Sequence, residues 1–176
     1  MRKVLFAFAI AGMLSTAALA GPIDEVEPND SFDEAQVLPD DFFEPFGAGS
    51  VEGFLAADDV DYFLVNLIEG ELATASIFDF TPGDNFDNDS LLGVFAPDGT
   101  LFAVDDDGGP GFLSSIAFFP TESGAWAFAV SGFGDDDFNG SHGEAFEYRL
   151  VLSIPEPTTF GLMLVGAALV ARKRRS

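Results

Sequence analysis

Oxygen-bearing side chains are concentrated near the start of this chain of 176 residues. Four of the six residues from 25 to 30 carry them, namely Glu25, Glu27, Asn29 and Asp30. Pro28 favours an extended backbone, in which alternate side chains project to the same side. The side chains of residues 25, 27 and 29 would then point together, so this segment can offer several oxygen atoms to one ligand.

A second group of carboxylates, Asp58, Asp59 and Asp61, stands at the start of the next strand-like stretch. If the two groups pack together without a cation, like charges come into contact and some of their pKa values rise. Ca²⁺ binds six to eight oxygen atoms at about 2.3–2.6 Å, supplied by carboxylates, amides and backbone carbonyls. The two groups therefore indicate a calcium site. The alternative is that these acidic residues cap turns and keep an acidic surface soluble.

The other residue types leave little room for catalysis. The chain has no cysteine, which excludes thiol nucleophiles, disulfides and cysteine-ligated zinc. Its one histidine, His142, lies in a Gly- and Ser-containing loop, where little would orient a catalytic base. We expect a solvated loop histidine and no enzymatic activity. A carboxylate pair for glycoside hydrolysis stays open, although any acidic sandwich would offer such pairs.

The distribution of charge excludes several classes of partner. The formal net charge is −23, and residues 21–154 hold 29 acidic residues against one basic residue, Arg149. Such a domain repels phosphate, which excludes nucleic-acid binding and docking on an anionic lipid surface. A hydrophobic content of 48% with 21 Phe residues excludes a disordered chain, because disordered acidic chains are poor in aromatic residues.

Short hydrophobic runs closed by Gly, Pro or Asp predict an all-β fold for residues 21–154, an antiparallel β-sandwich or jelly roll of about eight strands. The expected strands are 50–55, 61–67, 71–78, 91–96, 101–105, 114–119, 125–131 and 146–153. Pro97 and Gly99 predict a hairpin turn between the fourth and fifth strands. Ser31 and Glu34 have the spacing of a capping box and predict one helical turn.

Residues 1–20 have the pattern of a signal peptide. Arg2 and Lys3 precede an apolar run, and Ala18-Leu19-Ala20 stands before Gly21. Small residues at the first and third positions of that tripeptide suit cleavage by signal peptidase between Ala20 and Gly21. We therefore expect export of the protein, with an uncleaved membrane anchor as the alternative.

Residues 155–176 combine three features in a fixed order. Pro155, Glu156 and Pro157 form a stiff hinge, residues 158–171 are almost wholly apolar, and the chain ends in a basic cluster. The cluster consists of Arg172, Lys173, Arg174 and Arg175. As a helix the apolar run would be about 21 Å long, short of a hydrocarbon core of about 30 Å. Basic residues after it would stay in the cytoplasm. We expect a short C-terminal membrane helix.

This combination resembles the PEP-CTERM sorting signal of bacteria that possess an exosortase. The resemblance implies transient insertion into the inner membrane, recognition by the exosortase and removal of the tail. It also implies delivery to the cell surface or an extracellular polymer matrix, with polysaccharide or matrix proteins as partners. The alternative is a membrane anchor that is retained.

Motifs along the rest of the chain are Glu27-Pro28-Asn29-Asp30-Ser31 with Ala35, Gly53, Asp61-Tyr62-Phe63, Leu91 to Gly99, and Asp105-Asp106. Their order resembles that of the bacterial pre-peptidase C-terminal (PPC) domain, over about residues 25–152. That family consists of β-sandwiches similar to the collagen-binding modules of clostridial collagenases. In those modules calcium joins an N-terminal acidic segment to the start of a strand. By position, the resemblance implies the ligands Glu25, Glu27, Asn29, Asp30, Asp58 and Asp61, with Tyr62 beside them.

The expected function is that of an exported, non-enzymatic, calcium-stabilised β-sandwich with a structural or adhesive role. Two alternatives remain open. A carbohydrate- or protein-binding module would show an exposed row of Phe or Trp on one sheet face. A hydrolase would show a cleft with two facing carboxylates.

Overall fold

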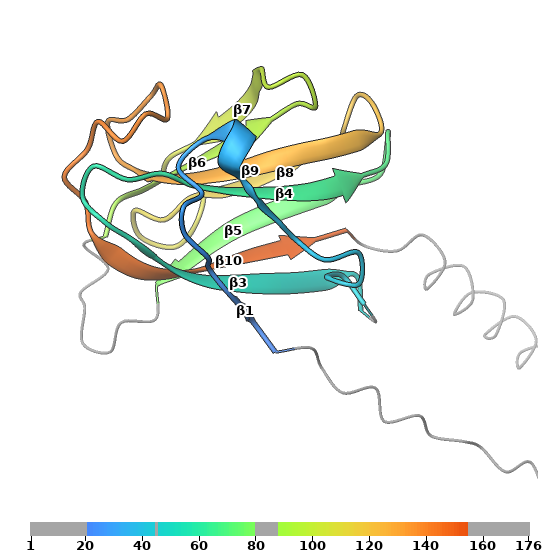
Figure 1. Ribbon diagram of the computed structural model, residues 1–176, viewed down its shortest axis with the longest axis horizontal. Coiled ribbons are helices and arrows are strands. Elements are labelled where there is room, and N and C mark those ends of the chain that lie inside the picture. The colour runs from blue at the N-terminus through green and yellow to red at the C-terminus, as the bar shows by residue number, and fades with distance from the viewer. Residues whose placement is uncertain (1–20, 45, 80–87, 155–176) are drawn as a thin grey trace, which may run out of the picture.

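The computed structural model describes residues 21–44, 46–79 and 88–154, which form two β-sheets packed face to face (Figure 1). The strands and the single turn of 3-10 helix (η1) have the following bounds: β1 Ile23–Asp24, η1 Phe32–Glu34, β2 Gln36–Val37, β3 Ala48–Leu55, β4 Asp61–Leu67, β5 Ala73–Asp79, β6 Ser90–Phe95, β7 Leu101–Asp105, β8 Ser115–Phe118, β9 Gly124–Gly132 and β10 Phe146–Ser153. The predicted all-β sandwich is confirmed.

Each sheet has five strands. The first sheet has the order β1-β3-β10-β5-β8 and the second the order β2-β4-β9-β6-β7. The long strands pair antiparallel, whereas β1 pairs with β3, and β2 with β4, in parallel. The prediction of a purely antiparallel sandwich is therefore wrong at these two pairs. The reason is that the N-terminal segment adds a short strand to one edge of each sheet before β3 begins.

All eight strands predicted from the sequence are present, with ends that differ by at most two residues. The hairpin turn is also confirmed: Gly99 has a φ of +80°, and the Ala96 amide donates to the carbonyl of Thr100 at 2.9 Å. The helical turn exists as η1, but its N-cap residue Ser31 makes no side-chain bond to the backbone. Its hydroxyl donates instead to the Glu34 carboxylate at 3.1 Å.

Alternation along β9 explains how the core is divided. Trp126, Phe128 and Val130 point between the sheets into the main core. Ala127 and Ala129 point to the opposite face and are also buried, because Tyr62, Phe95, Phe138 and their neighbours cover them. Small residues on that face leave room for a loop to lie close to the second sheet.

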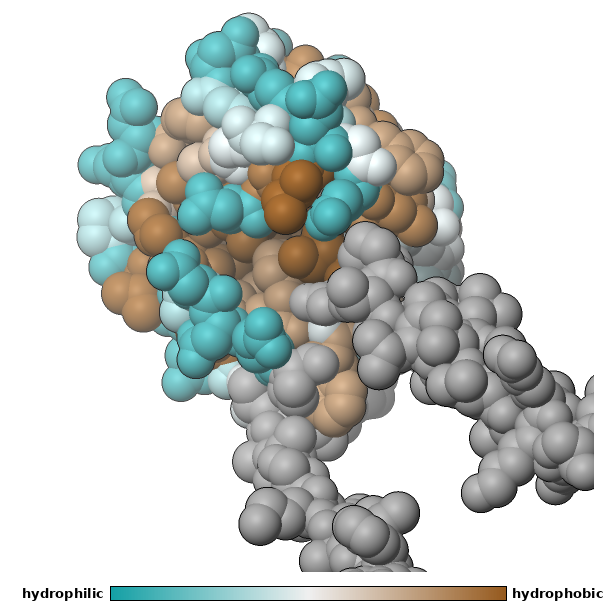
Figure 2. Space-filling model, turned by 90° about the vertical axis from the view of Figure 1, so that its right-hand side faces the viewer, coloured by the Kyte–Doolittle hydropathy of each residue, from teal (hydrophilic) through white to brown (hydrophobic). Residues whose placement is uncertain are grey.

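Figure 2 looks onto the end of the sandwich at which β4 and β10 finish, and apolar side chains gather there among hydrophilic ones. Ile68 and Phe119 lie in two loops of this end and are 57% and 61% exposed. The Gly70 amide joins the two loops by donating to the carbonyl of Pro120 at 2.9 Å. β4 begins at the opposite end, with Asp61.

Two predictions fall outside the residues that the structure describes: the signal peptide at 1–20 and the sorting signal at 155–176. Ala20, Pro155, Glu156, Pro157, Arg172, Lys173, Arg174 and Arg175 belong to these segments. Within the described residues no helix has the length and apolar character needed to cross a membrane.

Candidate cation site

The N-terminal segment crosses from one sheet to the other. It leaves β1 at the edge of the first sheet, passes the 3-10 turn and reaches β2 at the edge of the second sheet (Figure 1). Two backbone bonds hold the crossing: the Glu25 amide donates to the carbonyl of Glu52, and the Tyr62 amide donates to the carbonyl of Asn29, both at 2.9 Å. We call residues 25–35 the crossing segment. Its acidic part lies over the start of β4.

This course brings together the two groups of oxygen ligands that the sequence singles out. Carboxylate oxygens of Glu25, Glu27 and Asp61 lie within 4.8 Å of one another. Oxygens of Glu27, Asp30 and Asp59 form a second group with the same spacing. Glu27 belongs to both, so the five carboxylates form one continuous cluster.

Two side chains at the base of this cluster, Asn29 and Asp61, are fully buried. One Asp61 oxygen, Oδ2, accepts a bond from the Tyr148 hydroxyl at 2.7 Å, and the Asn29 amide nitrogen donates to Glu25 at 3.4 Å. The second oxygen of Asp61 and the side-chain oxygen of Asn29, both Oδ1, are buried without a hydrogen-bond partner. An unmatched buried acceptor costs about 1–3 kcal/mol, so both oxygens call for a hydrogen-bond donor or a cation.

The electrostatics of the cluster favour the same partner. Burial, followed by the contact with Glu25 and its charge, raises the pKa of Asp61 to about 10. Burial and the charge of Asp59 also raise the pKa of Glu27. Burial and the negative charges of Asp61 and Glu25 raise the pKa of the Tyr148 phenol well above its ordinary value. A divalent cation would replace the proton that Asp61 otherwise needs.

Five of the six predicted ligands, Glu25, Glu27, Asn29, Asp30 and Asp61, lie at this place. Asp58 belongs to neither group of carboxylates: its side chain is exposed, and its φ of +65° turns the backbone so that Asp59 faces the cluster. The sequence analysis placed Asp59 in the acidic group but named Asp58 as the ligand, because residue spacing does not reveal that Asp58 has a left-handed backbone conformation.

Sequence reasoning also missed Tyr148, which reaches Asp61 from β10 in the other sheet. The alternation of β10 placed this residue on a face of large side chains, but no sequence signal linked it to the acidic segments. Tyr62, expected beside the ligands, instead donates its hydroxyl to the carbonyl of Phe138 at 3.2 Å.

The prediction of a solvated His142 is wrong, because the side chain is only 8% exposed. Its Nε2 lies 2.6 Å from the carbonyl oxygen of Asp59, and its Nδ1 accepts a bond from the Glu144 amide at 3.1 Å. The histidine is buried because residues 132–144 fold over the small-residue face of the second sheet. Backbone groups therefore engage both ring nitrogens.

A further group of carboxylates, Asp89, Asp106 and Asp107, lies at the end of the β6–β7 hairpin. Asp89 and Asp106 are partly exposed, and each has one buried oxygen without a hydrogen-bond partner. Burial, followed by the charges of neighbouring aspartates, raises the pKa of both. The sequence shows the run of aspartates here but does not predict a site.

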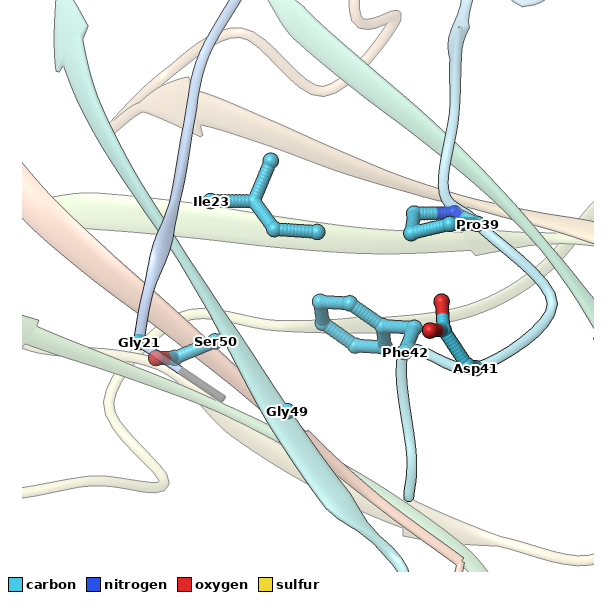
Figure 3. Close-up of a pocket in the computed structure, with 7 residues that line it drawn as sticks. All are labelled: Gly21, Ile23, Pro39, Asp41, Phe42, Gly49 and Ser50. Atoms are coloured by element: carbon cyan, nitrogen blue, oxygen red, sulfur yellow. The ribbon is translucent and has the colours of Figure 1, made fainter. Parts of the chain in front are cut away.

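Two hollows among the described residues differ in position, and the larger one adjoins the cation site. One of about 70 Å³ lies under the loop before β3, where Ile23 and Phe42 point toward each other (Figure 3). Its other lining residues are Gly21, Pro39, Asp41, Gly49 and Ser50. It has room for a few water molecules. An open hollow of about 350 Å³ adjoins the cation site at Glu25, Glu52, Phe54 and Glu147.

No family model and no curated protein matches this chain. Among solved structures, it is similar to the periplasmic inhibitor of g-type lysozyme PliG from Aeromonas hydrophila, with 18% identity, a TM-score of 0.49, and coverage of 74% of this chain and 98% of that one. The pre-peptidase C-terminal domain of collagenase from Bacillus anthracis gives 11% identity, a TM-score of 0.43, and coverage of 68% and 93%. CorA, a surface-associated copper-binding protein of Methylomicrobium album BG8, gives 14% identity, a TM-score of 0.45, and coverage of 69% of this chain and 98% of that one. None of these similarities assigns a function to this chain.

Proposed function

We propose that this chain is an exported, non-enzymatic β-sandwich that calcium stabilises and that has a structural or adhesive role at the cell surface or in an extracellular polymer matrix. The observation that carries the calcium part is the pair of buried oxygens, Asn29 Oδ1 and Asp61 Oδ1, which lack hydrogen-bond donors beside four further carboxylates. Carboxylates and an amide oxygen are the donor set that Ca²⁺ prefers.

The ion would join parts of the chain that few other contacts connect. The proposed ligands Glu25, Glu27, Asn29 and Asp30 belong to the crossing segment, whereas Asp61 begins β4 of the second sheet and Asp59 lies in the turn before it. Glu25 also accepts a bond from the Phe54 amide of the first sheet at 2.8 Å. Bound calcium would therefore fix the crossing segment to both sheets and neutralise the repulsion within the cluster.

Calorimetric titration of the purified protein with calcium tests this proposal. Calcium at 100 times its dissociation constant should add about 2.7 kcal/mol to the free energy of unfolding, since the site exists only in the folded chain. The melting temperature should then rise by several degrees for a domain of this size. Glu27→Gln should remove most of the rise, because Glu27 belongs to both carboxylate groups. A melting curve that responds to neither calcium nor chelator would contradict the proposal.

The export and sorting part of the proposal rests on the sequence patterns at the two ends. Signal peptidase would remove residues 1–20, and an exosortase would act at Pro155-Glu156-Pro157 while the apolar segment stands in the inner membrane. Mass spectrometry of protein from the surface of an exosortase-bearing host should find Gly21 as the first residue and should not find the cluster Arg172 to Arg175. Recovery of intact Ser176 on the surface form would show a retained anchor instead.

One observation favours a second candidate function, that of a carbohydrate-binding module. Phe54 on β3 and Phe78 on β5 flank β10 on the outer face of the first sheet and are 52% and 44% exposed. Their register partners on β10 are Glu147 and Arg149, whose side chains lie between the two rings on the same face. Neighbouring strands are about 4.8 Å apart and the two positions differ by two residues along the strands, so the rings stand roughly 12 Å apart, and one polysaccharide chain could contact both.

Affinity electrophoresis in gels that contain matrix polysaccharide tests this second candidate. The double variant Phe54→Ala, Phe78→Ala should lose any retardation that the wild type shows. Phe133→Ala is the matched control, because Phe133 is 57% exposed and lies outside the first sheet. Equal retardation of all three proteins would leave the outer face without a role in binding.

A further inference from the structure

A loop that begins at the end of β9 holds residues 58–62, which we call the acidic turn, in place. This covering loop comprises residues 132–144, and its Phe138 packs with Val60 and Tyr62 of the turn. His142 contacts the carbonyl of Asp59 at 2.6 Å, and Phe138 accepts a bond from the Tyr62 hydroxyl at 3.2 Å. Three residues of the turn, Asp59, Val60 and Tyr62, are thus tied to the covering loop.

The hydrogen bonds of His142 define its tautomer. Nδ1 accepts a bond from the Glu144 amide, so the proton of the neutral ring is on Nε2. Nε2 therefore donates to the carbonyl oxygen of Asp59. A glycine must lie behind the ring, because a Cβ at Gly132 would stand 2.5 Å from Nδ1. The ring is a buried donor in a fixed orientation, aimed at the backbone of a candidate ligand.

The covering loop is itself rigidly built. Asp135 is buried and accepts bonds from the Ser131 hydroxyl at 2.6 Å and from the Asn139 and Gly140 amides at 3.1 and 2.9 Å. A Cβ at Gly140 would lie 2.6 Å from the carbonyl oxygen of Asp58, and Gly140 has a φ of +82°. The loop therefore lies as close to the acidic turn as backbone atoms allow.

The acidic turn needs such support. Asp58 has a left-handed backbone conformation, which costs a residue with a Cβ roughly 1 kcal/mol or more. The Asp59 carboxylate accepts a bond from the Val60 amide at 2.9 Å, so its direction depends on the local backbone. If the Asp59 carbonyl lost its donor, the turn could relax and Asp59 would leave the group that it forms with Glu27 and Asp30.

From these contacts we propose that His142 is a positioning residue for the cation site: by holding the carbonyl of Asp59, it presets the Asp59 carboxylate for the ion. The inference rests on the proposed calcium site. Partners that orient metal ligands are typically worth 10- to 100-fold in affinity. Loss of the Nε2 donor should therefore weaken calcium binding by at least about tenfold.

Two substitutions separate the effect of the Nε2 hydrogen-bond donor of His142 from the effect of its side-chain volume. His142→Leu fills similar space and donates no hydrogen bond, whereas His142→Gln keeps an N–H that can reach the same carbonyl. Calorimetry with calcium should give a dissociation constant about tenfold or more above wild type for the Leu variant, and one much nearer to wild type for the Gln variant. Ser141→Ala is the control, because Ser141 is exposed and its hydroxyl donates to Asn139 of its own loop.

The wild-type protein provides a measurement that does not depend on how the variants fold. The chain has one histidine, so its imidazole signals need no assignment. The Nε2 proton should appear as a slowly exchanging NMR signal and should move during calcium titration with the dissociation constant found by calorimetry. If wild type binds calcium but this signal stays fixed, or if the Leu variant binds as tightly as wild type, the role of His142 is refuted while the calcium site stands. Absence of calcium binding by wild type refutes both.

Discussion

Two buried aspartates of this molecule, Asp135 and Asp61, have opposite surroundings. Asp135 is 1% exposed and accepts hydrogen bonds from one hydroxyl and two backbone amides. Burial raises its pKa, but the bonds from Ser131, Asn139 and Gly140 outweigh burial, and the pKa lies below its ordinary value. Asp61 is equally buried, accepts a bond only from Tyr148, and has its pKa raised to about 10.

The difference lies in the supply of donors rather than in the depth of burial. The backbone around Asp135 folds so that it satisfies the carboxylate, which makes Asp135 a structural support of the covering loop. Around Asp61 the neighbours are other carboxylates, which a stable fold tolerates only if a proton or a cation intervenes. We infer that backbone and hydroxyl donors alone stabilise the Asp135 carboxylate, whereas the Asp61 carboxylate would be stabilised by the proposed ion.

The largest effect should come from Asp135→Ala. The substitution leaves the Ser131 hydroxyl and two backbone amides without their charged acceptor, and bonds of this kind are worth about 1.5–3 kcal/mol each. We expect a loss of about 3 kcal/mol or more in the free energy of unfolding, measured by urea denaturation with calcium present. The exposed neighbour gives the control, since Asp136→Ala should change stability by less than about 0.5 kcal/mol. Equal stability of the two variants would remove the contrast between Asp135 and Asp61.

Asp61→Asn, unlike Asp135→Ala, should not lower the stability of the calcium-free protein. It removes a carboxylate that is expensive to ionise, so the calcium-free protein should keep its stability or gain some. The gain of about 2.7 kcal/mol expected for wild type in excess calcium should disappear. Thermal melting with calcium and with chelator measures both quantities. A variant that keeps the full response to calcium would show that Asp61 is not a ligand.

The two aspartates should also give stability opposite dependences on pH. Because the pKa of Asp135 is lowered on folding, its contribution is present above its ordinary pKa of 3.8 and is lost as the pH falls through the lower folded value. Because the pKa of Asp61 is raised to about 10, its contribution is complete below 3.8 and is lost progressively as the pH rises toward 10.

Calcium-free wild type should therefore melt at a lower temperature at pH 8 than at pH 5, by several degrees. Calcium, or the substitution Asp61→Asn, should reduce that decline. Asp61→Asn should leave the loss below pH 4 unchanged, whereas calcium stabilisation should disappear there as the carboxylate ligands become protonated. Melting curves from pH 3 to 8 in both conditions decide the matter. A decline above pH 5 that is the same in all three samples would exclude Asp61 as its cause.

The smallest effect distinguishes two adjacent residues. Asp59→Asn should weaken calcium binding by about tenfold, because it removes one carboxylate from a group of three. Asp58→Asn should leave the affinity near wild type, since Asp58 points to solvent and Asn tolerates its left-handed conformation. Calorimetry on both variants provides the comparison. The reverse order of affinities would restore Asp58 as the ligand that the family resemblance implies.

The sequence predicted the long strands because each is a short hydrophobic run closed by Gly, Pro or Asp, and because β9 and β10 also alternate their side chains with a period of two. β1 and β2 escaped prediction because two residues cannot display a period. Their parallel pairing depends on the crossing of the N-terminal segment, which is a tertiary feature. The acidic segments were visible as clusters. Pro28 led to the expectation of an extended first segment, but the backbone bends at Glu27.

The details of the site depended on information that no local pattern contains. The choice between Asp58 and Asp59 depends on the left-handed backbone of Asp58, against whose carbonyl Gly140 of the covering loop lies closely. The burial of His142 follows from the same loop, which lies over Ala127 and Ala129. A run of alternate alanines on a strand whose other face is aromatic does suggest close coverage, but it does not say which segment supplies it.

The crossing segment has a consequence for the durability of the protein. Beyond the cation site it is held by the backbone bond from the Tyr62 amide to the Asn29 carbonyl and by β1 and β2, each of which pairs over only two residues. Segments with few such bonds open locally at a small fraction of the free energy of global unfolding. When calcium is scarce, the first part of the chain should therefore detach while the two sheets stay folded. Proteases outside the cell would then trim the protein from its N-terminal side, so that calcium would control the lifetime of the protein as well as its melting temperature.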